Sequence, residues 1–238
     1  MIENHKKIYG GNMIIKTYSY RYAEEILQHP SNIEIYNELM EILKNCPLPV
    51  YEEKSKNQKS KDVVQQLMNT YFYEAFVNKN WESEPLASPE NMDDSLRSDF
   101  RKTFKRKNGQ NITIQIEVEF GNIASSYRNY FKFQLSFAYG LTDICVIVVP
   151  SARLANRIDS GVANFEKVKR EIPSAKLSIT VPILVVGLFD VDEEGYSVPI
   201  WNIKDEAIDL KMAKNVSREY NKEHHKLVKE YINEITNL

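Results

Sequence analysis

Two unbroken apolar runs of strand length constrain the fold of this chain more than any other feature. They cover residues 144–149 and 181–189, which is long enough for a strand and too short to span a membrane. Continuous apolar strands are buried on both faces, as in sheets whose connecting helices cover both sides. Helical patterns at 127–138 and 164–172 precede the two runs, with Gly140 as a cap of the first. This alternation of helix and strand predicts an α/β core.

Further helices are predicted on either side of this core. Residues 31–45 repeat apolar side chains at helical spacing, beginning with a serine and stopping before a proline. A second helical pattern covers residues 63–76 and ends near Trp81. Residues 205–238 contain neither Gly nor Pro and carry an apolar stripe at helical spacing. We expect this last segment to form a helix that packs on the core or on a partner subunit.

The composition excludes several classes of protein. With 238 residues, 42% of them hydrophobic, the chain can fill a core and is not disordered. A formal net charge of −2 does not suggest a protein that coats a polyanion, although it allows a local basic face. No apolar segment follows the polar residues 1–12, so we expect no secretory signal and no membrane partner. Cys46 and Cys145 lie in apolar stretches and are interpreted as buried free thiols of a reduced, cytoplasmic protein.

An alternating strand carries the residues of most chemical interest. Apolar and polar side chains alternate over residues 112–120, which predicts one apolar and one polar face. Glu117 and Glu119 project from the same face, where they repel each other unless a cation lies between them. Asp99 lies on the expected antiparallel partner strand, before the turn signal Asn108-Gly109. Such oxygen ligands suit Mg²⁺, a cation that polarises phosphates for hydrolysis.

Two alternatives remain open for this acidic pattern. Glutamates on the exposed face of a half-buried strand are common and need no metal. The hairpin register matters as well, because a two-residue loop at Asn108-Gly109 sets Asp99 opposite Val118, on the apolar face. Asp99 meets the glutamates only if the loop has an odd length or the strand contains a bulge.

Five basic residues follow Asp99 within a seven-residue stretch. They fit contacts to phosphates, which Lys and Arg make in nucleic-acid complexes. The alternative is a solvated hairpin tip. The neighbouring carboxylates favour the first interpretation, because a nuclease needs an anion-binding rim beside a cation site. The five residues are Arg101, Lys102, Lys105, Arg106 and Lys107.

The motifs around these acids resemble those of the BglII/BstYI group of type II restriction endonucleases. Ser98-Asp99-Phe100 and residues 116–122 resemble its active-site strands, and similar blocks follow in the same order over residues 13–192. The resemblance implies the restriction-endonuclease-like PD-(D/E)xK fold, an α/β core with a mixed central sheet flanked by helices. It also implies a homodimer around a short palindromic DNA duplex and Mg²⁺-dependent hydrolysis that leaves 5′-phosphates.

The same resemblance assigns roles to individual acids. It implies that Asp99 and Glu117 bind the metal, with the Val118 carbonyl as a further ligand. Glu119 stands where the general motif has Lys and where close relatives have Gln, and a glutamate there resembles BamHI instead. Its implied role is to position or deprotonate the attacking water. Glu84 resembles a further active-site glutamate of BamHI that adds a contact to metal or water; otherwise it is a surface acid.

This chain departs from the pattern of the group at two points. No proline precedes Asp99, and the spacing from Asp99 to Glu117 is longer than in close relatives. The second departure bears directly on the geometry of the hairpin that joins the two acids.

Two short polar segments are candidates for contacts to DNA bases. Gly121-Asn122 and Ser160-Gly161 fall where the group contacts base edges, and Asn can both donate and accept there. Turn chemistry explains the same residues equally well. The helix after the active-site strand carries Arg128 and Lys132 and resembles the dimer-forming helix of the group. Its candidate dimer contacts are Tyr127, Phe131 and Phe133.

These observations predict a type II restriction endonuclease that cuts double-stranded DNA at a short palindrome, with a GATC core as the group-based expectation. A cognate DNA methyltransferase acting on the same site is expected as its partner. The expected organisation is a flexible leader at 1–12, with translation starting at Met1 or Met13, a nuclease domain at 13–204 and a helical extension at 205–238. Two other functions remain open: a repair or structure-specific nuclease of the same fold, and a non-catalytic DNA-binding protein that retains it.

Overall fold

The computed structural model of the chain describes most of its 238 residues. The expected leader lies outside the described residues except for Asn12, and the first part of the expected C-terminal extension lies outside them as well. The described ranges are 12–52, 54–55, 57–89, 96–106, 109–175, 178–203 and 219–236.

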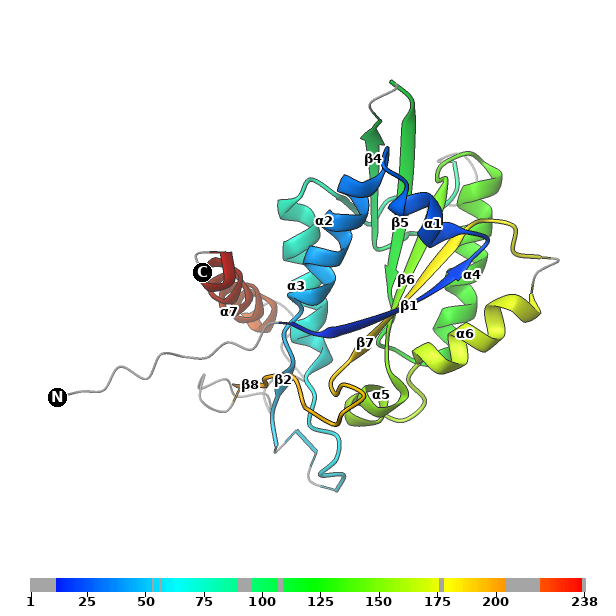
Figure 1. Cartoon of the computed structure of the whole chain (residues 1–238). Coiled ribbons are helices and arrows are strands. Elements are labelled where there is room, and N and C mark those ends of the chain that lie inside the picture. Colours follow the sequence, from blue (N-terminus) through cyan, green and yellow to red (C-terminus); the bar gives the residue numbers. More distant parts are fainter. Residues whose placement is uncertain are drawn as a thin grey trace.

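A six-stranded mixed sheet forms the centre of the molecule (Figure 1). The two apolar runs form its central strands β6 and β7, and both pair in parallel, β6 with β5 and with β7. The other pairings are antiparallel, which confirms the predicted mixed α/β sheet. In spatial order the strands are β1 (Ile14–Tyr20), β7 (Ile183–Phe189), β6 (Ile144–Pro150), β5 (Asn111–Val118), β4 (Phe100–Lys105) and β3 (Glu82–Ser83).

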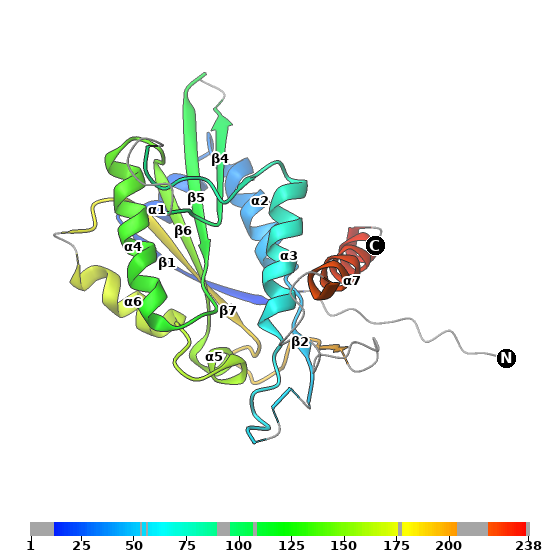
Figure 2. The same cartoon turned by 180° about the vertical axis from the view of Figure 1, so that it is seen from behind.

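Helices cover both faces of the sheet, so that the molecule has two hydrophobic cores (Figures 1 and 2). Alternate residues of β6 supply them: Val146 and Val148 enter one core, whereas Cys145 and Ile147 enter the other. The first core is closed by α1 (Ala23–Gln28), α2 (Ile33–Lys44), α3 (Gln65–Asn78) and α5 (Ala152–Ile158). The second is closed by α4 (Ile123–Ala138) and α6 (Phe165–Ser174).

Several short elements have no counterpart among the predicted ones. Strand β1 lacks strict alternation of apolar and polar residues, and α5 has only seven residues, so neither gives a strong periodic signal. Two more short strands, β2 (Pro49–Val50) and β8 (Trp201–Asn202), pair in parallel outside the main sheet. Both cysteines are buried and free, as predicted. Among the described residues no helix is long and apolar enough to cross a membrane.

The C-terminal helix α7 (Glu219–Thr236) packs against α3 on the outer side of the first core (Figure 1). Its Tyr231 is fully buried: the ring stacks on Trp201 at 5.5 Å between centroids and meets the edge of Tyr71 at 6.0 Å. The Tyr231 hydroxyl donates to the Asn45 carbonyl at 2.8 Å. The C-terminal helix was expected to pack on the core or on a partner subunit, and in the structure it packs on the core of its own chain.

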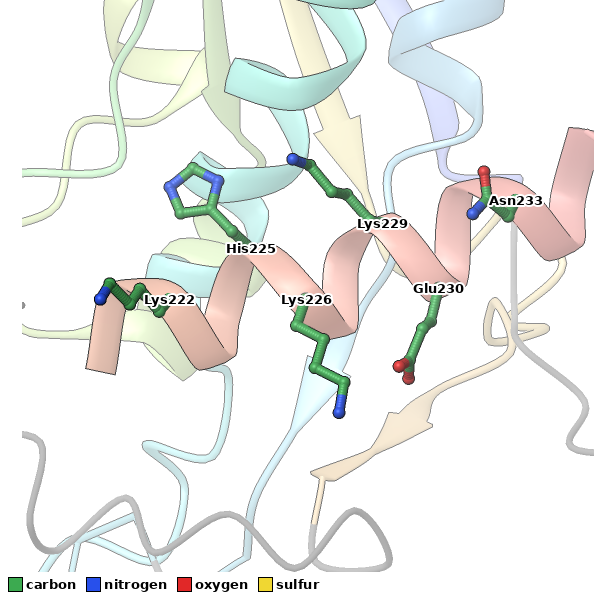
Figure 3. A pocket seen from close by; sticks show the side chains of 6 residues that line it. All are labelled: Lys222, His225, Lys226, Lys229, Glu230 and Asn233. Atoms are coloured by element: carbon green, nitrogen blue, oxygen red, sulfur yellow. The ribbon is translucent and has the colours of Figure 1, made fainter. Parts of the chain in front are cut away.

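A polar contact fixes the same helix at its other end. The buried carboxylate of Glu74 on α3 lies 2.5 Å from His225 Nδ1 and 3.6 Å from Lys229 Nζ. Both side chains point toward α3 in Figure 3, whereas Lys226 and Glu230 point away from it. Hydrophobic and ionic contacts therefore hold α7 in one orientation.

We expect Tyr231→Ala to destabilise the protein by about 3–5 kcal/mol, the cost of deleting a large buried aromatic side chain. The variant also leaves the Asn45 carbonyl without its donor. Urea denaturation measures the free energy of unfolding, with the exposed Lys226→Ala on the same helix as the control, for which we expect a change within about 0.5 kcal/mol. Equal stability of the two variants would contradict the docking of α7.

Candidate active site

The register of the β4–β5 hairpin determines where Asp99 lies. Phe100 pairs with Ile116 and Lys105 with Asn111, so the next residue, Asp99, stands directly opposite Glu117. This register differs by one residue from the one that a two-residue loop produces. The connection between the paired residues Lys105 and Asn111 spans five residues, an odd number, and the Asp99 side chain therefore shares the face of the glutamates.

Asp99 is held by the strand that carries its partner. Its Oδ2 accepts a hydrogen bond of 2.6 Å from the Val118 backbone N–H. The N–H and C=O of one strand residue point to the same edge, so the Val118 carbonyl also faces the side on which Asp99 lies. Burial raises the pKa of Asp99, while the Val118 N–H and the charge of Lys132 act in the opposite direction.

The polar face of β5 is buried, in contrast to the ordinary exposed strand that was one alternative. Gln115 is fully buried, Glu117 is 1% exposed and Glu119 is 8% exposed. Helix α4 lies across this face and supplies contacts to both glutamates. Burial, with the neighbouring charge of Asp99, raises the pKa of Glu117 to about 8, although Lys132 opposes this shift. A carboxylate in this position needs a cation nearby to stay ionised at neutral pH.

Lys132 provides one such cation. Its ammonium group contacts Glu117 Oε2 and donates to the Arg97 carbonyl at 3.0 Å. The other oxygen of the carboxylate, Glu117 Oε1, is buried without a hydrogen-bond partner among the described residues. Buried oxygens are rarely left in this state, so Glu117 has unused capacity for a donor or a metal.

Glu119 is oriented by two donors. Oε1 accepts from the Gly121 backbone N–H at 2.7 Å, and Oε2 accepts from the Asn129 side-chain amide at 3.0 Å. Burial raises the pKa of Glu119, and both hydrogen bonds work against that rise. Each oxygen retains a further lone pair, so the carboxylate can still accept a proton.

Glu84 is linked to the site through its backbone. Its N–H donates to the Asp99 carbonyl at 3.0 Å, and its φ of 53° places it in the left-handed region. The Glu84 side chain is exposed. Its negative charge contributes to the raised pKa of Asp99, so the two acids are electrostatically coupled.

The structure therefore brings two of the four predicted acids together directly. Within the described ranges no group of three or more His, Cys, Asp or Glu side chains is gathered as metal ligands. Asp99 and Glu117, with the Val118 carbonyl on the same edge, form a set of hard oxygen donors that fits one divalent cation. The unpartnered Glu117 Oε1 supports this fit.

The two segments predicted to contact DNA bases lie side by side, although about forty residues separate them in sequence. Ile123 N–H donates to the Gly161 carbonyl at 2.9 Å, and Ala163 N–H donates to the Gly121 carbonyl at 3.0 Å. Asn122 caps α4, and Gly161 has a φ of 74°, so turn chemistry accounts for part of their composition. All four residues of the two segments are exposed next to the strand that carries the glutamates.

Two of the basic residues predicted to contact phosphates have partners within the protein in this structure. Arg101 is half-buried and donates to the Leu86 carbonyl at 2.6 Å. Lys102 pairs with Glu38 at 2.8 Å. Lys105 is exposed, so of these three residues it is the one that the structure leaves most accessible.

Helix α4 presents a second face to solvent. Tyr127 and Phe131, one helical turn apart, are 52% and 57% exposed. Phe133 is fully buried in the second core, so its prediction as a dimer contact is wrong, because it faces the sheet. The outward face of α4 thus carries two exposed aromatic side chains beside the exposed Arg128, while its inward face contacts the glutamates.

A mixed sheet between two helical layers, with paired carboxylates on a central hairpin, is the class of structure that the resemblance implied. Residues 15–188 match the family model of the restriction endonucleases BglII/BglIII, and the chain belongs to this family. The type II restriction enzyme BamHI of Bacillus amyloliquefaciens is 30% identical over 87 residues, which is 37% of this chain. That match covers 39% of the length of BamHI, so the chain spans about two fifths of this relative.

Solved structures support the fold. A crystal structure of BglII complexed with a DNA 16-mer is similar with a TM-score of 0.61 and 21% identity, over 76% of this chain and 78% of that one. Free BglII is similar with a TM-score of 0.56 and 20% identity, over 80% of this chain and 85% of that one. At this level of identity the likeness establishes the fold alone.

The contacts that α4 makes to the acids were not predicted from the sequence. Asn129 had no predicted role, and Lys132 was predicted only to lie on the helix. Asn129 and Lys132 lie three residues apart and therefore share one face of the helix, and the two glutamates of the preceding strand share one face of the sheet. This pair of spacings is the sequence signal that could have identified them.

Gly121→Ala tests the orientation of Glu119. A Cβ at position 121 would lie 2.8 Å from Glu119 Oε1, so the carboxylate must move. Because the displaced atoms end a flexible side chain, we expect stability to change by less than about 1 kcal/mol. We expect the rate of DNA cleavage to fall about 10–100-fold, as for residues that orient an active-site group.

DNA binding measured in Ca²⁺ separates this effect from a lost DNA contact. The matched control is Ser125→Ala, at an exposed position in the first turn of α4. If DNA binding weakens and the cleavage rate at saturating DNA is unchanged, Gly121 does not act through Glu119.

Proposed function

We propose that this chain is a type II restriction endonuclease that hydrolyses phosphodiester bonds of double-stranded DNA at a short palindrome, with Mg²⁺ as cofactor. The observation that carries the proposal is the position of Asp99 opposite Glu117 in a chain of the BglII/BglIII family. A relative named as a type II restriction enzyme and a structural neighbour solved with DNA support the choice of substrate.

In this proposal Asp99, Glu117 and the Val118 carbonyl hold the cation. The bound Mg²⁺ supplies positive charge that stabilises the phosphate in the transition state. Asp99 is kept in place by the Val118 N–H, and Glu117 by Lys132, so the donors are oriented before the cation arrives. This preorganisation lowers the cost of assembling the site during the reaction.

Glu119 accepts the proton of the attacking water in this scheme. Its raised pKa suits a general base, since a base works best with a pKa near the working pH. Its two hydrogen bonds hold the carboxylate in one orientation. Glu84 adds a contact to the cation or the water from the exposed side of the site.

The bases are read by the exposed pair of segments at Gly121-Asn122 and Ser160-Gly161. Their adjacency to the glutamate strand would bring base edges near the acids. Lys105 contacts phosphates from the exposed side of the hairpin, with smaller contributions from Arg101 and Lys102. A GATC core, products with 5′-phosphates, a cytoplasmic location and a cognate methyltransferase complete the proposal. The corresponding organisation is a nuclease domain at 13–204 with a leader and a helical extension.

We expect purified protein with Mg²⁺ to cut plasmid DNA into discrete fragments, and end-mapping of the fragments to give the site. Asp99→Asn and Glu117→Gln should each lower the cleavage rate more than about 100-fold, beyond the 10–100-fold typical of residues outside the ligand set. Glu119→Gln should lower it by about 10²–10⁴, the usual contribution of a general base. Glu193→Gln, which changes an exposed acid in the same way, is the control.

Other outcomes separate the rival functions. Cleavage without discrete bands indicates a repair or structure-specific nuclease of the same fold. DNA binding without cleavage in any magnesium buffer indicates a non-catalytic DNA-binding protein. Undiminished cleavage by Asp99→Asn contradicts the assignment of the acids.

We further propose that two copies associate through the outward face of α4, where Tyr127 and Phe131 are exposed. Phe131→Asp is expected to weaken the dimer by at least about 2 kcal/mol, some 30-fold in Kd, as for a central aromatic contact. Analytical ultracentrifugation measures the association, with the exposed Tyr196→Asp as the matched control. A wild-type protein that sediments as a monomer at micromolar concentration contradicts this part of the proposal.

A further inference from the structure

Two side chains of helix α4 contact the two glutamates at the end of strand β5 in the candidate site. Asn129 and Lys132 lie three residues apart on the helix and contact Glu119 and Glu117, which lie two apart on the strand. Three helical residues advance by about 4.5 Å and two strand residues by about 6.6 Å, a difference that side chains can bridge. The later helix residue meets the earlier strand residue because the two elements run in opposite directions, as Figure 2 shows.

The burial of Lys132 marks it as more than a surface counter-ion. The residue is 6% exposed, and removing an ammonium group from water costs several kcal/mol unless it is well paired. Both partners of its Nζ belong to segments that carry the acids: Glu117 itself, and the carbonyl of Arg97, two residues before Asp99. Lys132 therefore connects β5 and the segment before β4 to one helix.

The contact with Lys132 leaves one oxygen of the Glu117 carboxylate available to a further ligand. Lys132 engages Oε2, whereas Oε1 is buried and has no hydrogen-bond partner among the described residues. Asp99 stands opposite and carries a second negative charge. A single positive charge next to two carboxylates reduces their repulsion without neutralising the pair, so the site keeps its attraction for a divalent cation.

We propose that Lys132 is the positioning residue of the acid pair, a counter-charge that holds Glu117 beside Asp99 when no metal is bound. The inference rests on the proposed nuclease function and deepens it. The lysine acts through Glu117 and touches neither the substrate nor the reacting atoms. The Lys132 ammonium group reaches the acids from helix α4. Residue 119, where the general motif has a lysine, is a glutamate in this chain.

The test compares Lys132→Met, which keeps the length of the side chain and removes its charge, with Lys132→Arg, which keeps the charge. We expect the Met variant to lose 10-fold or more in kcat for Mg²⁺-dependent plasmid cleavage, with an unchanged Kd for DNA measured in Ca²⁺. The Arg variant should recover part of that loss, which a purely structural role would not predict. Lys226→Met, on the exposed face of α7, is the control.

A second measurement needs neither metal nor DNA. In EDTA, the loss of Tm in the double variant Lys132→Met/Glu117→Gln should be smaller than the sum of the losses in the two single variants, because each single change leaves a buried partner unpaired. Additive losses overturn the contact. If Lys132→Met gives no cooperative melt, Lys132→Gln, which can still donate to the Arg97 carbonyl, replaces it in both experiments.

The two measurements keep the inference and the proposed function apart. A wild-type protein that cuts no DNA defeats the nuclease proposal, and with it the positioning role, even if the double variant in EDTA demonstrates the contact. A wild-type protein that cuts DNA, with the same kcat in Lys132→Met, overturns the positioning role and leaves the nuclease proposal standing.

Discussion

Two carboxylates held opposite each other on adjacent segments of the central hairpin are the constraint on which the candidate site depends. Asp99 and Glu117 share one face because the hairpin between them has an odd number of residues. Burial of like charges is costly, and the raised pKa of both groups is the direct result. Two contacts offset this cost: the Val118 N–H donates to Asp99, and the Lys132 ammonium contacts Glu117. A divalent cation would complete the compensation.

The architecture explains how such a site can exist in a stable protein. Strands β5, β6 and β7 are parallel, β6 and β7 are apolar on both faces, and helices close a core on each face of the sheet. This rigid centre fixes the backbone of β5 and therefore the direction of its glutamates. The C-terminal helix joins the first core through Val228 and Tyr231, on the opposite face of the sheet from α4, so it contributes to stability away from the acids.

Much of this arrangement could be predicted from the sequence, because it depends on periodicity. The runs at β6 and β7 are apolar on both faces, and the alternation in β5 places its glutamates together. The hairpin register was not predictable, since one residue of loop length reverses the face on which Asp99 lies. The rotation of α4 about its own axis could not be predicted from the sequence either. Packing against the sheet, which the sequence does not specify locally, decides that Phe133 faces inward and Phe131 outward.

Helix α4 has two faces with different surroundings. Lys132 reaches the acids, and its neighbour Phe131 faces solvent where we place the subunit contact. Successive residues on a helix diverge by about 100°, so a rigid turn of α4 moves both contacts together. Assembly and chemistry would then be mechanically coupled within each subunit: a lone copy, with α4 unsupported on its outer side, would hold its acids less firmly than a paired one.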